Sequence, residues 1–350
     1  MTRVIQVDAG NPQQEIIEQA AAIIRSGGLV AFPTETVYGL GADAMNEAAI
    51  RKIFEAKGRP GDNPLIVHVC DRNDVERVAT EVSAKAWQLI ERFWPGPLTL
   101  VLRRRTEVAR SVSAGLSTVA VRMPHNEIAL ELIRRARAPI AAPSANSSGR
   151  PSPTTARHVA RDLGGRIDMI LDGGATKIGI ESTVLDMTAE TAVILRPGWI
   201  TEESLAAITG PIERASSREE LRRSPGTRYR HYSPRARVVL VEQSSSQSIE
   251  RLMKEHLRNG PVGLIGHTPL DVNDAKLYQI RLENSARDYA RSIYAALREL
   301  DEKKPCVILV EAISEEGEGA AVMDRLRRAA SEEVNRHRRA NASTQETELE

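Results

Sequence analysis

The segment LVAFPTETVYGLGADA, residues 29–44, decides how the first part of the chain folds. It begins with four apolar residues, 29–32, which predict a buried strand. An amphipathic helix from about Pro12 to Arg25 precedes this strand, and Gly27 ends the helix. A helix that leads directly into a buried strand indicates that helices and a sheet pack in layers around a shared core.

The segments on either side continue this plan. Gly58 and Pro60 end the next predicted helix, since glycine accommodates the helix C-terminus and proline cannot continue it. We expect strands at 4–7, 65–69, 98–102 and 118–122, helices at 46–57, 83–93 and 126–137, and an antiparallel hairpin at 182–187 and 191–196. Together these elements predict a mixed α+β domain over residues 1–210.

A different pattern begins after residue 210. Residues 211–236 are rich in Gly, Pro, Ser and Arg without helical or strand periodicity, which predicts a linker. Strands and helices then alternate over residues 237–330, so we expect a smaller, Rossmann-like, doubly wound α/β domain. Residues 331–350 are polar and aperiodic, which predicts a disordered tail.

Composition excludes several functional classes. The 350 residues carry 48 Lys and Arg against 47 Asp and Glu, and residues 1–210 carry 24 of each sign. No global basic field is therefore available to hold nucleic acid non-specifically. Two cysteines are too few for a disulfide framework or a thiolate zinc site, and seven scattered histidines form no metal motif. Without a secretory leader or an apolar run near the roughly 18 residues of a membrane span, we expect a cytoplasmic protein with no membrane contact.

Familiar nucleotide-binding motifs do not suggest a function. No GxxxxGK[ST] loop is present, and the GxGxxA match at residues 39–44 begins seven residues after the preceding strand instead of at its end. What remains is a set of polar residues in apolar or Gly/Pro-rich surroundings, where simple patterning would place Val or Leu. These residues are Thr34, Thr36, Lys57, Arg59, Asn63, His68, Arg122, Ser144, Asn146, Ser182 and Arg196.

Each of these signals also has a structural interpretation. The alternatives are helix-end cations for Lys57 and Arg59, a hydrogen-bonded core histidine for His68, and turn formers for Asn63, Ser144 and Asn146. In the linker, the motif SPGTRYRHYSP (224–234) brings tyrosines beside cations, which can stack on an anionic ligand or only pin the linker to a surface. The four cations among the polar residues all stand at element ends, where loops converge on a common cleft.

Six segments together closely resemble the YrdC-like threonylcarbamoyl-AMP synthases, and the similarity spans nearly all of residues 10–205. The segments are 29–44, 52–69, 93–102, 118–124, 139–153 and 181–198. The linker motif and the following α/β domain resemble the longer, two-domain branch of that family. The resemblance implies a twisted mixed sheet whose helices form a concave cleft, followed by the Rossmann-like domain.

The resemblance also implies a reaction and its participants. L-threonine, bicarbonate and ATP would give L-threonylcarbamoyl-adenylate and pyrophosphate, with Mg²⁺ accompanying ATP and no metal site in the protein itself. This nucleotidyl transfer would be the first step toward threonylcarbamoyladenosine in tRNA, and a tRNA threonylcarbamoyl transferase machinery would use the product. A carbamate is labile in water, so a site must hold it in line with the α-phosphate and shield it.

The resemblance assigns roles to individual residues. The KxR and SxN signature falls on Lys57, Arg59, Ser144 and Asn146, which would be catalytic and bind ATP; Asn63, Thr118, Ser152, Arg196 and Tyr232 would complete the ATP site. Thr36, His68, Arg122 and Ser182 would contact L-threonine. Arg122 would fork onto the threonine carboxylate, and Tyr232 would act as a lid over the nucleotide. His68 is also a conceivable proton acceptor, although positioning alone can suffice.

Two rival functions are weighed against this interpretation. A related carbamoyltransferase of hydrogenase maturation carries zinc-finger modules that two cysteines cannot build. A non-catalytic, double-stranded RNA-binding, translation-associated module remains the alternative, but it has no evident need for the whole KxR and SxN set. The linker departs mildly from the family pattern, with Thr227 and Arg228 where Met and Lys are common.

Overall fold

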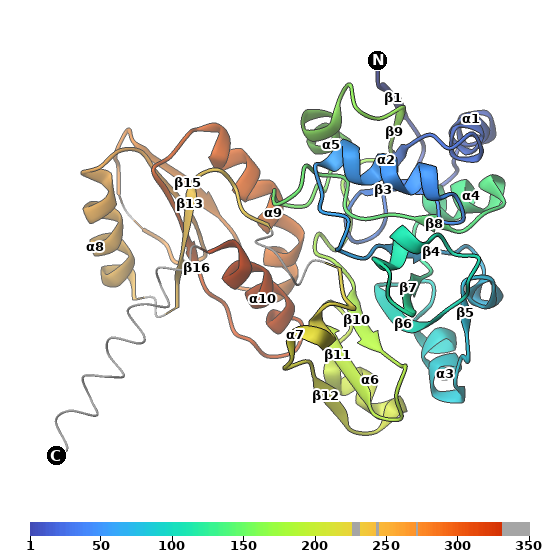
Figure 1. The fold of residues 1–350 in the computed structure, drawn as a ribbon. Coiled ribbons are helices and arrows are strands. Elements are labelled where there is room, and N and C mark those ends of the chain that lie inside the picture. Colours follow the sequence, from blue (N-terminus) through green and yellow to red (C-terminus); the bar gives the residue numbers. More distant parts are fainter. Residues whose placement is uncertain (226–231, 243–244, 271, 331–350) are drawn as a thin grey trace.

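The structure is a computed structural model that describes residues 1–225, 232–242, 245–270 and 272–330. It contains a large mixed sheet in the first part of the chain and a smaller parallel sheet in the second, each with its own helices (Figure 1). The expected fold class, a mixed α+β domain followed by a Rossmann-like domain, is confirmed. The predicted tail, 331–350, and residues 226–231 of the linker motif lie outside the described residues.

The first sheet mixes parallel and antiparallel neighbours. Its order is β1-β9-β2-β3-β8-β4-β7-β6-β10-β11-β12, and β5 pairs with β6 at one side. The strands are β1 (Arg3–Gln6), β2 (Val30–Phe32), β3 (Gly39–Asp43), β4 (Ile66–His68), β5 (Ala79–Thr80), β6 (Leu98–Arg104), β7 (Thr118–Arg122), β8 (Ile140–Ala141), β9 (Met169–Asp172), β10 (Thr183–Asp186), β11 (Ala192–Arg196) and β12 (Ile212–Arg214). The expected hairpin is confirmed as the antiparallel pair β10 and β11.

Helices cover both faces of this sheet. They are α1 (Gln14–Arg25), α2 (Glu47–Lys57), α3 (Ala84–Phe93), α4 (Glu127–Ala136), α5 (Ala156–Leu163), α6 (Glu202–Thr209) and α7 (Arg218–Leu221), with 3₁₀ turns at Arg72–Arg77 and Arg110–Ser113. Successive side chains of β2 point to opposite faces of the sheet, so the core has one part on each face. Val30 and Phe32 pack with α1 and α4, whereas Ala31 points to the face that holds α2 and α3. Helix α2 starts at an Asn46 cap and stops at Gly58, whose left-handed φ of 60° favours glycine.

The second sheet is wholly parallel, in the order β13-β16-β14-β15. Its elements are β13 (Arg237–Val241), α8 (Ser246–Leu257), β14 (Val262–Gly266), β15 (Leu277–Arg281), α9 (Ala286–Glu302), β16 (Val307–Glu311) and α10 (Gly319–Ala329). Helix α8 covers the outer face of this sheet, and α9 and α10 lie between the sheet and the first domain (Figure 1). Helices on both faces confirm the doubly wound arrangement.

Several elements were not expected from the sequence. Strand β3 is rich in glycine, so it lacks a strand-like pattern; a Cβ on Gly41 would lie 2.7 Å from the Phe32 ring and 2.8 Å from Ile140. Strand β9 and helices α5 and α6 are short and were also missed. Strand β12 and helix α7 lie inside 211–236, and β12 pairs with β11, so the first sheet continues past the expected boundary into the range assigned to the linker.

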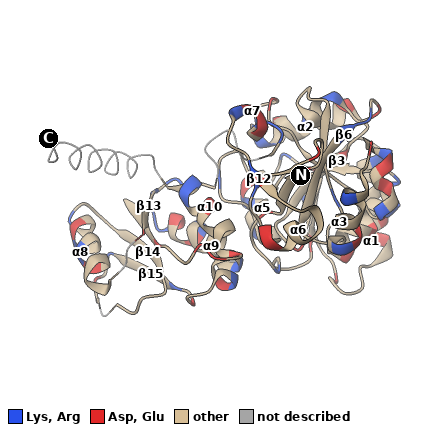
Figure 2. Cartoon of the chain, turned by 90° about the horizontal axis from the view of Figure 1, so that it is seen from below, with Lys and Arg blue, Asp and Glu red and all other residues tan. Residues whose placement is uncertain are grey.

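Charges of both signs occur together on surface helices of the described part of the chain. Figure 2 shows both basic and acidic residues on helices α1 and α7. Among the described residues, no helix combines the length and the apolar character that a bilayer crossing requires. The charge pattern in this view gives no single-sign stripe on these helices of the kind that tracks a nucleic-acid backbone.

Candidate active site

One pocket collects most of the residues that the sequence singled out. It lies where the carboxyl ends of β4 and β7 stand side by side, with His68 and Arg122 in register. An isolated bridge between Gly39 and Ser144 joins two further loops at its edge. The pocket is lined by Thr34, Thr36, Val37, Gly39, Arg59, Ile66, His68, Arg122, Ala142, Pro143, Ser144, Glu181, Ser182, Arg196, Pro225 and Tyr232.

Arg122 is buried at the base of this pocket and held on three sides. Its Nη2 lies 2.6 Å from Glu35 Oε2, Nη1 donates to Thr36 Oγ1 at 2.9 Å, and Nε donates to the Gly96 carbonyl at 3.1 Å. The guanidinium therefore has a fixed orientation. Both nitrogens of its fork already face protein oxygens, so a bound carboxylate would have to share or replace these contacts.

His68 is a buried neutral imidazole. Burial, together with the positive charge of Arg122, lowers the pKa of His68 to about 3. Its Nδ1 lies 3.2 Å from the Ile66 carbonyl, a distance at which a protonated Nδ1 donates to that oxygen. His68 is thus both the hydrogen-bonded core histidine of the structural interpretation and a residue of the pocket wall.

The buried imidazole should make the protein less stable in mild acid. His68 stays neutral in the folded state while an unfolded histidine takes up a proton below pH 6.5. Its titration therefore has no effect on stability above that pH and destabilises the fold increasingly as pH falls toward the folded-state pKa. At pH 5 the cost is about 2 kcal/mol. We expect His68→Gln to reduce the difference in unfolding free energy between pH 7 and pH 5 by about that amount in urea titrations. The exposed His125, changed to Gln, is the control, and an equal effect in both variants would contradict the assignment.

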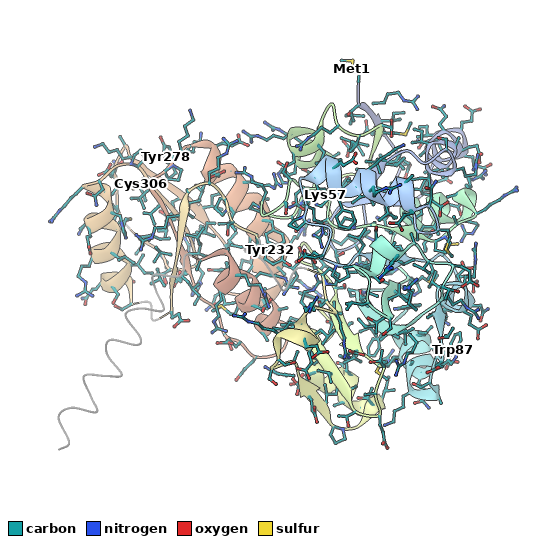
Figure 3. All side chains as sticks on the ribbon, viewed as in Figure 1. Met1, Lys57, Trp87, Tyr232, Tyr278 and Cys306 are labelled. Carbon is teal, nitrogen blue, oxygen red and sulfur yellow. The ribbon has the colours of Figure 1, made fainter. Side chains whose placement is uncertain are left out.

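Lys57 does not line the pocket, but it holds one of the pocket's loops in place through hydrogen bonds. Its Nζ donates to the carbonyls of Ser144 and Asn146 at 2.5 and 2.6 Å, and Figure 3 shows Lys57 on helix α2. Burial, followed by the charge of Arg59, holds the pKa of Lys57 well below its usual range. The alternative of a cation that satisfies its own helix end is wrong for Lys57, because both acceptors belong to another loop.

The loop that Lys57 holds is internally ordered as well. Ser144 Oγ donates to Asn146 Oδ1 at 2.6 Å, and Asn146 Nδ2 donates to the carbonyls of Ser147 and Arg150. Ser144 faces the pocket, whereas the Asn146 side chain is used within the loop. The structure therefore gives the two members of the SxN signature different surroundings.

Arg196 forms the opposite wall with Ser182. Its Nε and Nη2 donate to the Ser182 carbonyl at 3.2 and 3.0 Å, Nη2 also reaches Ser182 Oγ at 3.2 Å, and Nη1 donates to the Pro225 carbonyl. Burial is the main cause that lowers the pKa of Arg196 from its usual value. Since these donors meet neutral oxygens, Arg196 brings positive charge to the pocket, which suits an anionic ligand.

Three other predicted residues lie outside the pocket lining. Asn63 is fully buried, and neither polar atom of its side chain has a hydrogen-bond partner among the described residues, a costly arrangement that a ligand would relieve. Ser152 is buried and donates to Glu181 Oε1 at 2.5 Å. Thr118 lies at the far end of β7 from Arg122, in a separate hollow lined also by Arg103 and Arg222.

Two glutamates of the site were missed from the sequence. Glu35 pairs with Arg122, and Glu181 lines the pocket beside Ser182. Both are nearly buried acidic residues within otherwise apolar or small segments, the same signal that singled out their neighbours. Among the described residues, no group of three His, Cys, Asp or Glu side chains is placed to hold a metal ion.

Comparison with known proteins shows the family to which the chain belongs. The Sua5, YciO and YrdC family, described as telomere recombination, matches residues 22–198, and the C-terminal domain of threonylcarbamoyl-AMP synthase matches residues 200–331. The chain belongs to the threonylcarbamoyl-AMP synthase family. The resemblance inferred from the six segments is therefore confirmed.

Two curated threonylcarbamoyl-AMP synthases are similar over nearly their whole lengths. The protein of Pyrococcus abyssi is 48% identical over 322 residues, covering 90% of this chain and 94% of the relative. The protein of Bacillus subtilis is 46% identical over 342 residues, covering 95% of this chain and 96% of the relative. The similarity to both synthases thus extends over both domains of this chain.

Solved structures agree with this two-domain arrangement. The P. abyssi Sua5 structure complexed with L-threonine superposes with a TM-score of 0.89 at 46% identity, over 94% of this chain and 98% of that one. The Escherichia coli YciO structure matches 56% of this chain and 95% of its own, with a TM-score of 0.51 at 26% identity. The fold is therefore that of a two-domain member of the threonylcarbamoyl-AMP synthases.

Proposed function

We propose that the protein is a nucleotidyltransferase that converts L-threonine, bicarbonate and ATP into L-threonylcarbamoyl-adenylate and pyrophosphate. The observation that carries the proposal is the convergence of Arg59, Arg122 and Arg196 on one pocket of a chain in this family. The threonine nitrogen first joins the bicarbonate carbon with loss of water. The carbamate oxygen then attacks the α-phosphorus of ATP, and pyrophosphate leaves.

We assign L-threonine to the side of the pocket formed by Thr36, His68 and Arg122. Ser182 would contact it from the border with the ATP side, where Arg196 donates to Ser182. Arg122 supplies a fixed cation for the carboxylate, with Thr36 already hydrogen-bonded to it. The low pKa of His68 makes it a weak proton acceptor near neutral pH. Positioning of the amino group is therefore the better supported role for His68, and the general-base role is the alternative.

We assign ATP to the side formed by Arg59, Ser144 and Arg196, with Tyr232 above it. Arg59 and Arg196 can neutralise charge that builds on the leaving pyrophosphate, and Asn63 offers a buried amide whose hydrogen bonds are not yet made. Lys57 and Asn146 act by holding the loop that presents Ser144. Ser152 acts through Glu181, and we expect the hollow at Thr118 to be reached by a distal part of the nucleotide.

Mg²⁺ is expected to enter with ATP. The two carboxylates at the pocket, Glu35 and Glu181, are engaged with Arg122 and Arg325, so the described residues do not offer a ligand set for the ion. We therefore propose that the phosphate oxygens of ATP hold it, and the protein's own groups orient the substrates. The product would pass to the tRNA threonylcarbamoyl transferase machinery in the cytoplasm.

The test is pyrophosphate release by the purified protein with ATP and Mg²⁺. We expect release only when both L-threonine and bicarbonate are present, and little release when L-serine replaces L-threonine. Release that is independent of either co-substrate would contradict the proposed reaction. If ATP binds but no combination releases pyrophosphate, the non-catalytic RNA-binding module becomes the leading function, and binding of a double-stranded RNA should be measured next.

A further inference from the structure

The wall of the pocket that holds Glu181 and Tyr232 is packed into the core of the second domain. Val37 and Ile180 of the first domain and Tyr232 of the linker motif belong to the same buried apolar cluster as Ile293 and Leu297 of α9. Val37 and Tyr232 also line the pocket. One side of the pocket wall is therefore shared between the two domains, and Figure 3 shows Tyr232 at their junction.

Glu181 is held by two side chains of the second domain. Its Oε2 accepts from Tyr294 OH of α9 at 2.9 Å and from Arg325 Nε of α10 at 2.8 Å. Its Oε1 accepts from Ser152 at 2.5 Å on the first-domain side. Thus the carboxylate joins the predicted ATP side of the site to α9 and α10.

Tyr232 is held by the same two second-domain residues. Its ring stacks on Tyr294 with centroids 5.5 Å apart, and the Arg325 guanidinium lies 5.6 Å from the centroid of the Tyr232 ring. The backbone of Tyr232 has a φ of 65°, which is uncommon for a bulky residue and needs support from its surroundings. Packing against Tyr294 and Arg325 supplies that support.

The backbone leading to Glu181 also fits closely against α9. A Cβ on Gly179 would lie 2.3 Å from the Ala290 carbonyl and 2.7 Å from Arg291 Cα. The Gly179 amide in turn donates to the Thr36 carbonyl at 3.0 Å. There is therefore no room for α9 to move closer to the loop that carries Glu181 and Ser182 unless the loop moves as well.

The charges of this junction are matched to one another. Burial alone would raise the pKa of Glu181, but Arg325 and Arg196, with the hydrogen bonds from Ser152 and Arg325, outweigh it and hold the pKa below its usual value. Arg325 is itself 1% exposed and also donates to Asp324 and to the Pro197 carbonyl. A buried, paired charge of this kind fixes geometry because neither partner can move away without losing compensation.

We propose that the second domain is a structural part of the active site, in which Tyr294 and Arg325 are positioning residues that set Glu181 and Tyr232 at the pocket wall. This inference rests on the proposed function, since it makes the second domain necessary for ATP binding at that site. The two residues act through Glu181 and Tyr232 and do not themselves touch substrate.

Tyr294→Phe is the main test, because it removes one hydroxyl and keeps the ring that stacks on Tyr232. Tyr289→Phe is the matched control: Tyr289 is equally buried on the same helix, but its hydroxyl contacts His267 within the second domain. We expect Tyr294→Phe to raise the KM for ATP about fivefold or more, with the KM for L-threonine changed less than about twofold. Tyr289→Phe should leave both values within about twofold of wild type, and the thermal melts of both variants should stay cooperative.

Arg325→Lys is the second variant, since lysine keeps the charge but cannot reproduce the guanidinium contacts. We expect it to raise the KM for ATP at least as much as Tyr294→Phe. The proposal is overturned if the folded Tyr294→Phe protein keeps its KM for ATP within twofold of wild type, or if Tyr289→Phe raises that KM equally.

A failure of the proposed function can be separated from a failure of this inference. If the wild-type protein releases no pyrophosphate, calorimetric binding of a non-hydrolysable ATP analogue replaces the KM. A dissociation constant raised about fivefold by Tyr294→Phe and unchanged by Tyr289→Phe supports the positioning role even then. Equal affinities in wild type and Tyr294→Phe overturn it.

Discussion

Arg59→Ala is expected to lower adenylate synthesis more than tenfold while the protein remains folded. Arg59 lies just beyond the end of α2 and lines the pocket, where its side chain can face an anionic ligand. Its Nη2 also donates to the Pro64 carbonyl at 3.2 Å, a contact within the loop that follows the helix. Removing one hydrogen-bond donor from an oxyanion hole lowers kcat by a factor of about 10²–10³, and we expect the loss of a cation that faces the leaving pyrophosphate to cost at least about tenfold. The measurement is kcat/KM from pyrophosphate release, with circular dichroism as a check of folding.

The matched control for Arg59 is Arg51→Ala on α2, the helix that precedes Arg59. Arg51 is exposed and does not line the pocket, so its loss should leave kcat/KM within about twofold of wild type. An Arg59→Ala protein with unchanged turnover would remove Arg59 from the catalytic set. An equal loss in both variants would instead indicate that the overall charge of this surface matters.

Lys57→Met should cause both a catalytic and a stability defect. The variant removes the Lys57 donor from both carbonyls, but the Ser144 carbonyl keeps a hydrogen bond from the Asn146 amide at 3.0 Å. The buried Asn146 carbonyl loses its side-chain donor, which costs about 1–3 kcal/mol. The loop that presents Ser144 loses its anchor, and small misplacements in an active site reduce rates by about a hundredfold. We therefore expect kcat/KM to fall by about that factor, measured at a temperature where urea titration shows the variant folded.

Lys52→Met tests whether the defect is specific to the pocket. Lys52 lies on the same helix and its Nζ also donates to a backbone carbonyl, that of Gly27 at 2.7 Å, but it is exposed. We expect less than about 1 kcal/mol of destabilisation and unchanged turnover. If Lys57→Met were as active as Lys52→Met, the SxN loop would not need its anchor, and Lys57 would have no part in catalysis.

Local patterns were sufficient for many elements of the fold. Helix α2 has an apolar stripe and a glycine stop, and β7 is an apolar run between polar ends, so both were expected close to their observed bounds. Strand β3 was missed because its glycines are selected by the close approach of Phe32 and Ile140, a tertiary requirement that leaves no alternation in the sequence. Strand β12 was missed because pairing with β11, rather than its own composition, makes it a strand.

The candidate site divides in the same way. The sequence showed the polar residues in apolar surroundings one at a time, and the family motifs grouped them. It did not show how their side chains are arranged in space. Lys57 was expected among the ATP contacts, yet its acceptors are carbonyls 87 and 89 residues away. Which side chain faces the pocket and which supports it from behind depends on how separate loops meet.

The sequence by itself determined the order of helices and strands, the family, and most of the residues that gather around the pocket. It could do so because strand and helix periodicity and short motifs are local properties of the chain. Only the tertiary structure decided that the second domain completes the wall of the pocket, through contacts between Glu181 and Arg325, 144 residues apart. Such a contact leaves no periodic signal in a single sequence, because its free energy arises only when folding brings a buried carboxylate and a buried guanidinium together.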